Sequence, residues 1–228
     1  MTKLKITLKL GKFLFPSKLD VSLMKTYVET FRRMVGKGEK LLLVTGGGEA
    51  AREYIKAARE AGIDESACDQ LGIEISRINA YFLIQLLQNL AYPEVPTTIK
   101  ELKEFFYHGK IVVMGGLTPG HSTMAVGALA AEAIGADCYI IASDVDGIYT
   151  SDPKIHKEAK KFEVISTDEA FKIASEGRIW AGTYEIDPIA IKIIERSKIP
   201  AYFIDGRNPK NLEKVLTGEK IGTYIKPS

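Results

Sequence analysis

Two segments of this 228-residue chain share a pattern in which β-forming residues run into glycines and a helical pattern follows at once. The first spans residues 41–58 and the second spans residues 111–133. Where a strand turns through glycine into a helix, the first backbone N–H groups of the helix have no partner within it and lie at the positive end of the helix dipole. Anions, and especially phosphates, bind at such positions. The pattern therefore predicts two phosphate sites, for two phosphorylated molecules or for the two ends of a phosphoryl transfer.

Strand and helix patterns alternate along the rest of the chain as well. Strands are predicted at residues 4–10, 40–45, 111–114, 138–143, 201–204 and 222–225. Helices are predicted after Asp20, after Gly48, from about Leu71 to Leu90, from Ser122 to Ile134, after Ser166, after Asp187 and after Asn208. Since the sequence contains no internal repeat, low-complexity segment or linker, the alternation predicts one α/β domain over residues 1–228, with a mostly parallel sheet covered by helices on both faces.

Composition and charge exclude several classes of protein. The 31 basic and 29 acidic residues are spread along the chain and leave a net charge of +2, without the polybasic block that indicates a nucleic-acid partner. No apolar run approaches the roughly 18 residues of a membrane-spanning helix, and the first residues lack the apolar core of a signal peptide. Cys68 and Cys138 are too few for a disulfide framework or a zinc site. We therefore expect a cytoplasmic protein that binds neither nucleic acid nor membrane.

The first glycine turn, Gly46–Gly48, is followed by Arg52 one helical turn later. Successive glycines let backbone N–H groups approach a phosphate, and the guanidinium of Arg52 could neutralise the same anion. One alternative is a tight turn that only packs the helix on the strand. A second alternative is a dinucleotide fingerprint, which is disfavoured because the chain passes straight into another helix where that motif needs a strand ending in an acidic residue.

The second glycine turn opens a polar loop, residues 117–123. From Gly115 to Ser122 it differs from a phosphate-binding P-loop at one position, where His121 replaces the lysine. A histidine is shorter than lysine and mostly neutral near pH 7, so it cannot do that lysine's work. We interpret the loop as one that wraps a sugar-phosphate. The alternative is a solvent-exposed loop in which Ser122 only caps the next helix.

Two further clusters lie at the ends of predicted strands. Residues 143–153 follow an apolar strand and carry carboxylates, which hold metal ions or orient lysines, together with Tyr149, a face for a nucleobase. Lys9 and Lys12 flank Gly11 at the end of the first strand, where they could stabilise a transferring phosphoryl group. Taken separately, the first cluster could be an ordinary surface turn and the lysines a solubility device.

Four elements, in order along the chain, are similar to the motifs of the amino acid kinase family. They are Lys-x-Gly-Lys from Lys9, Gly-Gly-Gly-x-x-x-Arg from Gly46, Gly-Gly-x-x-Pro-Gly-His-Ser-Thr from Gly115, and Val-Asp-Gly-Ile-Tyr-x-x-Asp-Pro from Val145. Each motif is weak alone, but the four in this order are specific, and the likeness extends over essentially the whole chain. Within the family, the chain resembles the archaeal uridylate (UMP) kinase branch.

The resemblance implies a three-layer α/β/α sandwich, usually in a homohexamer, that transfers the γ-phosphoryl group of ATP to UMP with Mg²⁺ and so serves pyrimidine nucleotide synthesis. The implied catalytic residues are Lys9, Lys12 and Asp144. The implied UMP-binding residues are Gly47, Asp69, Leu117, Thr118, Pro119, Gly120, His121, Ser122 and Thr123, with Asp69 on the ribose and the loop on the phosphate. The implied ATP-binding residues are Lys9, Gly11, Lys12, Gly48, Arg52, Ser143, Asp144, Tyr149 and Asp152. No side chain is assigned to the metal.

Some details of the chain depart from that branch. Ser143-Asp144-Val145 stands where the branch commonly has Thr-Asn-Val, and here the chain is similar to acetylglutamate kinases, in which the aspartate organises lysines. The first loop is one residue shorter than the usual Lys-x-Ser-Gly-Lys, so either Lys9 or Lys12 could meet the phosphoryl group. Two alternatives stay open: another kinase of the family, such as an isopentenyl phosphate or carbamate kinase, and a non-catalytic nucleotide-binding or storage protein. The long polar loop favours UMP over a small acceptor.

Overall fold

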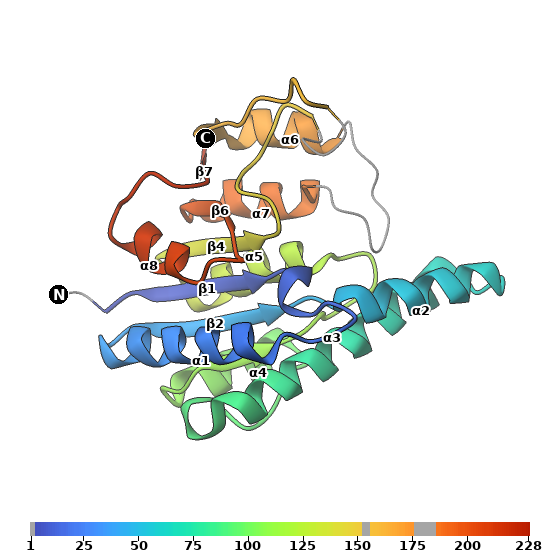
Figure 1. Ribbon diagram of the computed structural model, residues 1–228, viewed down its shortest axis with the longest axis horizontal. Coiled ribbons are helices and arrows are strands. Elements are labelled where there is room, and N and C mark those ends of the chain that lie inside the picture. The colour runs from blue at the N-terminus through green and yellow to red at the C-terminus, as the bar shows by residue number, and fades with distance from the viewer. Residues whose placement is uncertain (1–2, 152–155, 176–185) are drawn as a thin grey trace.

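A computed structural model describes residues 3–151, 156–175 and 186–228 of the chain (Figure 1). Within these ranges, seven strands form one sheet in the order β3-β2-β1-β4-β6-β7-β5. The strands are β1 (Lys5–Leu10), β2 (Lys40–Thr45), β3 (Val112–Met114), β4 (Cys138–Ser143), β5 (Val164–Ser166), β6 (Ala201–Asp205) and β7 (Thr223–Lys226). Only the β6–β7 pair among them is antiparallel, which confirms the prediction of a mostly parallel sheet.

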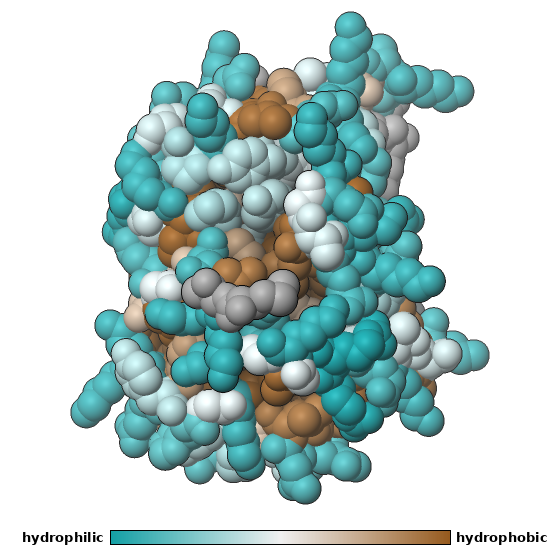
Figure 2. Space-filling view, turned by 90° about the vertical axis from the view of Figure 1, so that its left-hand side faces the viewer, coloured by the Kyte–Doolittle hydropathy of each residue, from teal (hydrophilic) through white to brown (hydrophobic). Residues whose placement is uncertain are grey.

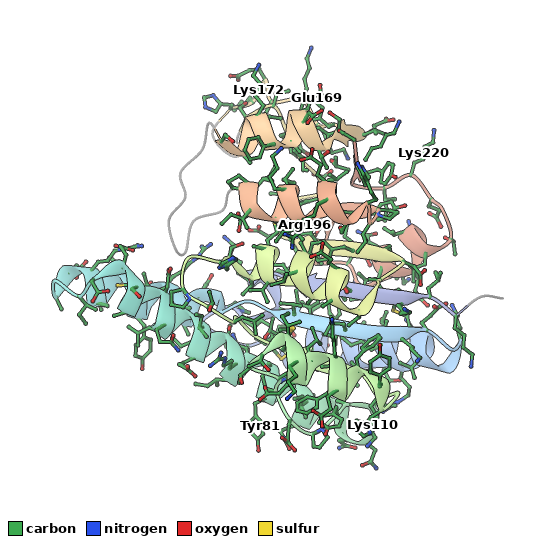
Figure 3. The ribbon with its side chains drawn as sticks, turned by 180° about the vertical axis from the view of Figure 1, so that it is seen from behind. Tyr81, Lys110, Glu169, Lys172, Arg196 and Lys220 are labelled. Atoms are coloured by element: carbon green, nitrogen blue, oxygen red, sulfur yellow. The ribbon has the colours of Figure 1, made fainter. Side chains whose placement is uncertain are left out.

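Helices cover both faces of the sheet (Figures 1 and 3). One face carries α1 (Val21–Gly36), α3 (Glu65–Leu87) and α8 (Lys210–Leu216) over a core that includes the alternating β1 residues Ile6, Leu8 and Leu10. The other face carries α4 (Ile99–Tyr107), α5 (Thr123–Ile134), α6 (Thr167–Ser175) and α7 (Pro188–Ser197). Helix α2 (Gly48–Glu60) packs against α3 through a small apolar cluster. The architecture is therefore a three-layer α/β/α sandwich.

Several helix starts follow the capping chemistry predicted from the sequence. The carboxylate of Asp20 accepts from the Leu23 N–H at the start of α1, and Ser122 Oγ accepts from the N–H groups of Met124 and Ala125 at the start of α5. Asp187 caps α7 in the same way through the Ile189 N–H. These short polar side chains satisfy N–H groups that have no partner within the helix.

Three elements differ from the sequence-based predictions. Helix α3 begins at Glu65, after the N-cap Asp64, and ends at Leu87 before the 3₁₀ turn η2 (Gln88–Leu90), whereas residues 71–90 were expected. Helix α4 was not predicted, although Thr98 caps it by accepting from the Glu101 N–H. The three-residue strand β5 was also missed, because so short a segment carries no readable alternation. The first helical residues of α3 are polar, so apolar periodicity alone placed its start too late.

The two edges of the sheet differ in character. All the strands from β1 to β4, and β6, end at the same edge, on the right of Figure 1. Figure 2 shows the opposite side of the molecule, where hydrophilic side chains predominate and hydrophobic atoms are visible between them. No helix in the described ranges is both long and apolar enough to cross a membrane. Since ligands of open α/β sheets bind beyond the carboxyl ends of the strands, the edge where these strands end is where a site is expected.

Candidate active site

The order of the strands creates a switch point between β1 and β4. From β1 the chain moves to β2 and β3 on one side, and it returns to place β4 and β6 on the other. At such a point the connections after the two neighbouring strands leave in opposite directions and open a crevice at their carboxyl ends. Gly11 follows β1 there and Ser143 ends β4. The predicted lysine loop and the predicted acidic cluster are therefore brought side by side.

Gly11 makes the close approach of these two strand ends possible. Its N–H donates to the carbonyl of Ala142 at 2.9 Å, and a Cβ at this position would lie only 2.8 Å from the same oxygen. A side chain would force the strand ends apart. The short 3₁₀ turn η1 (Lys12–Leu14) follows directly, and Lys12 Nζ lies 3.3 Å from Asp144 Oδ2. The aspartate after β4 thus holds a lysine of the β1 loop, as the resemblance to acetylglutamate kinases implied.

Lys9 belongs to the same electrostatic cluster. Its side chain is partly buried on β1, and desolvation lowers the pKa of Lys9 to about 8, with the Arg52 charge acting in the same direction and the Asp144 charge opposing both. Burial disfavours the charged form of an amine unless an anion compensates. Three basic groups, Lys9, Lys12 and Arg52, are therefore electrostatically coupled to the two carboxylates of Asp144 and Glu49. An excess of positive charge of this kind suits a phosphoryl group with several negative oxygens.

The first glycine turn packs on the lysine loop. Gly48 has φ +70°, and a Cβ there would lie 2.3 Å from the Phe15 carbonyl oxygen, which accepts from the Glu49 N–H at 3.0 Å. The Glu49 carboxylate in turn accepts from the Ser17 N–H at 2.8 Å, and this hydrogen bond holds the pKa of Glu49 below its usual value. Part of the N-terminal hydrogen-bonding capacity of α2 is thus used to fix residues 15–17. The sequence predicted that the N–H groups at this turn have no partner, whereas the Glu49 N–H already donates to the Phe15 carbonyl.

A cleft of about 680 Å³ lies beside this turn, between α2, α3 and the segment after η1. Gly47 and Arg52 line it, as does Asn79, which sequence reasoning missed. Asn79 Nδ2 donates to the Gly46 carbonyl at 2.8 Å and so fixes the turn from α3. A Cβ on Gly46 would lie 3.7 Å from Thr123 Oγ1, so the two glycine turns are neighbours.

The second glycine turn is anchored on α3. The Gly116 N–H donates to Ser76 Oγ at 2.7 Å, and the Gly120 N–H donates to Asp69 Oδ2 at 2.7 Å. Asp69 and Gly120 are 51 residues apart in the sequence, so the structure brings together two residues that the resemblance assigned to one substrate. Leu117 and Thr123 are partly buried, whereas Thr118, Gly120, His121 and Ser122 are exposed. The loop therefore presents mostly polar groups above the sheet edge.

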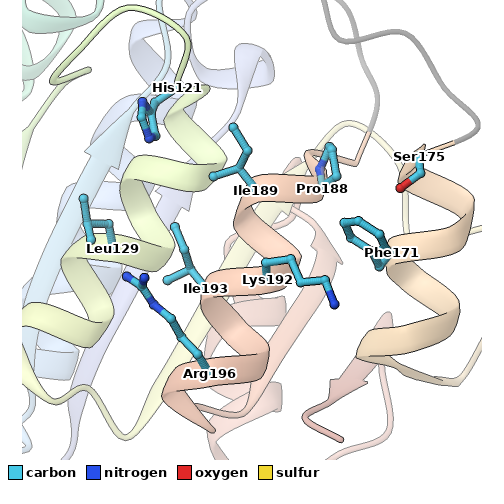
Figure 4. A pocket seen from close by; sticks show the side chains of 9 residues that line it. All are labelled: His121, Leu129, Phe171, Ser175, Pro188, Ile189, Lys192, Ile193 and Arg196. Carbon is cyan, nitrogen blue, oxygen red and sulfur yellow. The ribbon is translucent and has the colours of Figure 1, made fainter.

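His121 also lines a second cavity, of about 560 Å³, between α5, α6 and α7 (Figure 4). Apolar side chains, including Leu129 and Ile193, dominate its walls, and Lys192 lies 4.4 Å from the centre of the Phe171 ring. Arg196 pairs with Glu132 on α5 at 2.6 Å. Among the predicted site residues that the structure describes, His121 is the only one in the lining of this cavity, which is distinct from the cleft that Arg52 lines.

The third cluster occupies the ends of β4 and β6. Tyr149 donates from its hydroxyl to Asp146 Oδ1 at 2.5 Å, and this bond raises the pKa of Tyr149 to about 12. Lys161 Nζ lies 3.0 Å from the other carboxylate oxygen of Asp146, so the carboxylate that holds the Tyr149 hydroxyl is itself fixed. Ser143 Oγ lies 3.4 Å from Asp144 Oδ1. Asp152 falls outside the described residues.

Sequence reasoning missed the contribution of β6 to this cluster. The Gly206 N–H donates to the Ser143 carbonyl at 2.7 Å, and the guanidinium of Arg207 makes two hydrogen bonds to the Asp205 carboxylate, at 2.9 and 2.8 Å. These bonds hold the pKa of Asp205 below its usual value, while Asp205, Asp144 and Asp146 together raise the pKa of Arg207. A signal was present, since Asp205-Gly206 follows an apolar strand just as Asp144 does.

Carboxylates at this edge of the sheet could contribute ligands to a metal ion. Among the described residues, no group of three or more His, Cys, Asp or Glu side chains could hold a metal ion alone. Mg²⁺ on a nucleotide needs only one or two protein carboxylates, since phosphate oxygens and water supply the other ligands. Asp144, whose side chain is 16% exposed, fits this limited role.

The amino acid kinase family profile matches residues 6–205. The chain is 44% identical to a uridylate kinase of Hyperthermus butylicus over 216 residues, with 94% of each protein covered, and 45% identical to one of Methanosarcina mazei over 215 residues, with 94% and 92% covered.

Solved structures are similar over almost the full length. The crystal structure of uridylate kinase from Archaeoglobus fulgidus superposes with a TM-score of 0.84 at 40% identity, covering 98% of this chain and all of that one. A UMP kinase from Bacillus anthracis has a TM-score of 0.82 at 22% identity, covering 97% and 95% respectively, which shows a shared fold. From its motifs, its sheet edge and these relatives, the chain belongs to the amino acid kinase family.

Proposed function

We propose that the protein is a UMP kinase that transfers the γ-phosphoryl group of ATP to UMP. The observation that carries the proposal is a charged cluster at the edge where both glycine turns meet, in which Lys12 pairs with Asp144 and the pKa of Lys9 responds to the charges of Asp144 and Arg52. The names of relatives at 41–45% identity, which are uridylate kinases, support UMP as the acceptor. The reaction would supply UDP for pyrimidine nucleotide synthesis.

The site divides into an acceptor side and a donor side. We assign UMP to Gly47, Asp69 and the loop of residues 117–123, with Asp69 Oδ1 available for the ribose while Oδ2 holds Gly120. We assign ATP to Gly48, Arg52 and residues 143–152, with the ring of Tyr149 as a face for the base. The β1 loop, with Lys9, Gly11 and Lys12, lies between the two sides because β1 is the strand between β2 and β4.

In this arrangement an oxygen of the UMP phosphate attacks the γ-phosphorus of ATP in line with the bond to the leaving ADP oxygen. One P–O bond forms as the other breaks, and ADP leaves with the electron pair. Lys9 and Lys12 stabilise the charge on the transferring group, and Asp144 keeps Lys12 in position. Mg²⁺ bound with ATP would supply further charge neutralisation, with Asp144 as a candidate ligand.

An acceptor panel with purified protein tests the proposal. With ATP and Mg²⁺ we expect UMP to be converted to UDP, CMP and AMP to react much more slowly, and isopentenyl phosphate and carbamate to give no product above background. Chromatography of the nucleotides measures ADP and UDP directly. Faster product formation with isopentenyl phosphate or carbamate than with UMP would contradict the assignment of UMP as the acceptor. Binding of UMP without turnover would identify a non-catalytic nucleotide-binding protein.

We also propose that the enzyme is a cytoplasmic homohexamer, as its family resemblance implies. Exposed apolar side chains on α2 and α3 support the proposal, since Tyr54 is 62% exposed, Ile78 65% and Tyr81 56%. Figure 3 shows Tyr81 projecting outward from α3. Light scattering coupled to gel filtration would give six times the 25.1 kDa of the chain if the proposal is correct, and the mass of a monomer would contradict it.

A further inference from the structure

The loop that we assign to the UMP phosphate is held at its beginning by a side chain outside it. Arg77, on α3, donates from Nε to the Gly116 carbonyl at 3.2 Å and from Nη2 to the Leu117 carbonyl at 3.4 Å. Its side chain is only 20% exposed, and Nη1 lies 3.0 Å from Glu74 one turn earlier on the same helix. The guanidinium is therefore fixed on α3 while it holds two successive carbonyls of the loop.

This contact sets the direction of two backbone N–H groups. In a planar trans peptide the C=O and N–H bonds point to opposite sides. Because the carbonyls of Gly116 and Leu117 point toward Arg77, the N–H groups of Leu117 and Thr118 point away from it. Successive N–H groups turned to one side form a concavity that binds anions.

The far end of the loop is held by a second outside group. Ser122 Oγ donates to Asp187 Oδ2, which lies 65 residues further along the chain, and it accepts from the N–H groups of Met124 and Ala125. The other oxygen of Asp187 accepts from the Ile189 N–H at 2.8 Å. One carboxylate thus joins the starts of α5 and α7 and fixes the hydroxyl that ends the loop.

We propose that Arg77 and Asp187 are positioning residues that hold the two ends of the loop of residues 117–123 and so set the affinity for the phosphate of the acceptor nucleotide. The inference rests on the proposed function of the same loop. The family resemblance assigned neither residue a role in the site. Both act through backbone or side-chain groups of the loop, and Asp69 holds its middle at Gly120.

The Arg77→Met variant tests the first contact. We expect KM for UMP to rise about tenfold, which is the effect of losing about one charged hydrogen bond, while KM for ATP and kcat stay within about twofold. Arg77→Lys keeps the charge but not the fork of donors, so an intermediate rise is expected. Arg32→Met is the matched control, because Arg32 also pairs with a glutamate three residues earlier, Glu29, but on the surface of α1.

Asp187→Ala and Asp187→Asn test the second contact. Alanine removes both hydrogen bonds and should raise KM for UMP several-fold. Asparagine keeps one oxygen for the helix cap but turns an NH2 donor toward the Ser122 hydroxyl, so it should restore the cap and leave a smaller rise in KM. A double-mutant cycle with Ser122→Ala should show effects that do not add, since both changes break one contact. Asp20→Ala removes a comparable N-cap on α1 and serves as the control.

The outcomes separate this inference from the proposed function. Wild-type protein without UDP formation would overturn the proposed function itself. Active wild-type protein with Arg77 and Asp187 variants that match their controls would overturn the positioning roles. Equal increases in KM for both substrates would do the same, because they indicate general destabilisation. If circular dichroism shows that Arg77→Met does not fold, calorimetric titration of Arg77→Lys decides the question. Weaker binding of UMP with unchanged binding of ATP would support the positioning role, and unchanged binding of UMP would overturn it.

Discussion

At the scale of single residues, Lys9 links the fold to the chemistry most directly. Its amine lies on a central strand, where desolvation lowers its pKa to about 8 from an ordinary 10.5. The ammonium form therefore predominates below pH 8 and is lost as the pH rises through that value. A phosphate-stabilising lysine with such a pKa makes substrate capture sensitive to mildly alkaline conditions.

We expect kcat/KM for UMP to fall as the pH rises through about 8, because this parameter reports ionisations of the free enzyme. In Lys9→Arg the guanidinium stays protonated at all accessible pH values, so the alkaline limb should move upward by more than one unit even if the maximal rate is lower. Initial rates from pH 6 to 10 measure both profiles. Identical alkaline limbs in the two proteins would assign that ionisation to another group.

Thr7 shows that a buried hydroxyl can cost stability. Its Oγ1 is the one buried side-chain polar atom without a hydrogen-bond partner in the described ranges. Thr7→Val keeps the shape and removes the unsatisfied group, so the free energy of unfolding should rise by about 1 kcal/mol. Thr45→Val is the control on the neighbouring strand. There the hydroxyl donates to the Ser76 carbonyl at 2.8 Å, and the same change should lower stability by about 1–2 kcal/mol. Urea unfolding compares them, and a destabilised Thr7→Val would refute the account.

At the scale of secondary-structure elements, the start of α2 depends on glycine for two separate reasons. Gly48 has a positive φ and also touches the Phe15 carbonyl, whereas Gly62, beyond the end of the same helix, has φ +80° and no atom within 4 Å of where a Cβ would lie. The two positions therefore separate backbone strain from steric contact. Only the second effect connects α2 to the lysine loop.

Gly62→Ala should lower the free energy of unfolding by about 1 kcal/mol, the cost of placing a side chain at positive φ. Gly48→Ala should lose clearly more, and it should also lose kinase activity, because a Cβ 2.3 Å from the Phe15 oxygen must displace the segment that follows Lys12. Denaturant unfolding and UDP formation measure the two effects. Equal losses in the two variants would mean that the Phe15 contact is unimportant.

At the scale of the whole molecule, the order of the strands places the glycine turns and the acidic strand ends on different sides of β1. β2 and β3 lie on one side of β1 and carry the glycine turns, while β4 and β6 lie on the other and carry the acidic ends. Strand β1, with Lys9 and the following Lys12, stands between the two halves. The loop after β3 and the acidic cluster after β4 therefore lie on opposite sides of β1, while the turn after β2 carries residues that we assign to both nucleotides, Gly47 to UMP and Gly48 to ATP.

Hydrogen–deuterium exchange tests this division. Saturating UMP should slow exchange in residues 116–123 and at the α3 segment around Asp69, whereas a non-hydrolysable ATP analogue should slow exchange in residues 143–149 and at the Gly206 turn. Binding energy of this kind also stabilises the native state as a whole, so protection is compared between segments rather than in absolute terms. Protection of residues 143–149 by UMP alone would reverse the assignment.

Local patterns were sufficient for most of the elements and failed where the signal was short or polar. The apolar run of β2 and the caps of α1, α5 and α7 predicted their elements because these signals act within a few residues. The start of α3 was placed too late because its first turn is polar, and α4 was missed although Thr98 and Glu101 form a capping pair. Polar first turns are recognised by caps and not by periodicity.

The sequence by itself determined that this chain would be a mostly parallel α/β protein with glycine turns and lysines at strand ends, because strand, glycine and helix preferences are local. Only the tertiary structure decided which of those groups meet. The pairing of Lys12 with Asp144, of Asp69 with Gly120 and of Ser122 with Asp187 spans 51 to 132 residues, and depends on the order of strands in the sheet. That order is fixed by packing of both faces at once, which no local pattern encodes.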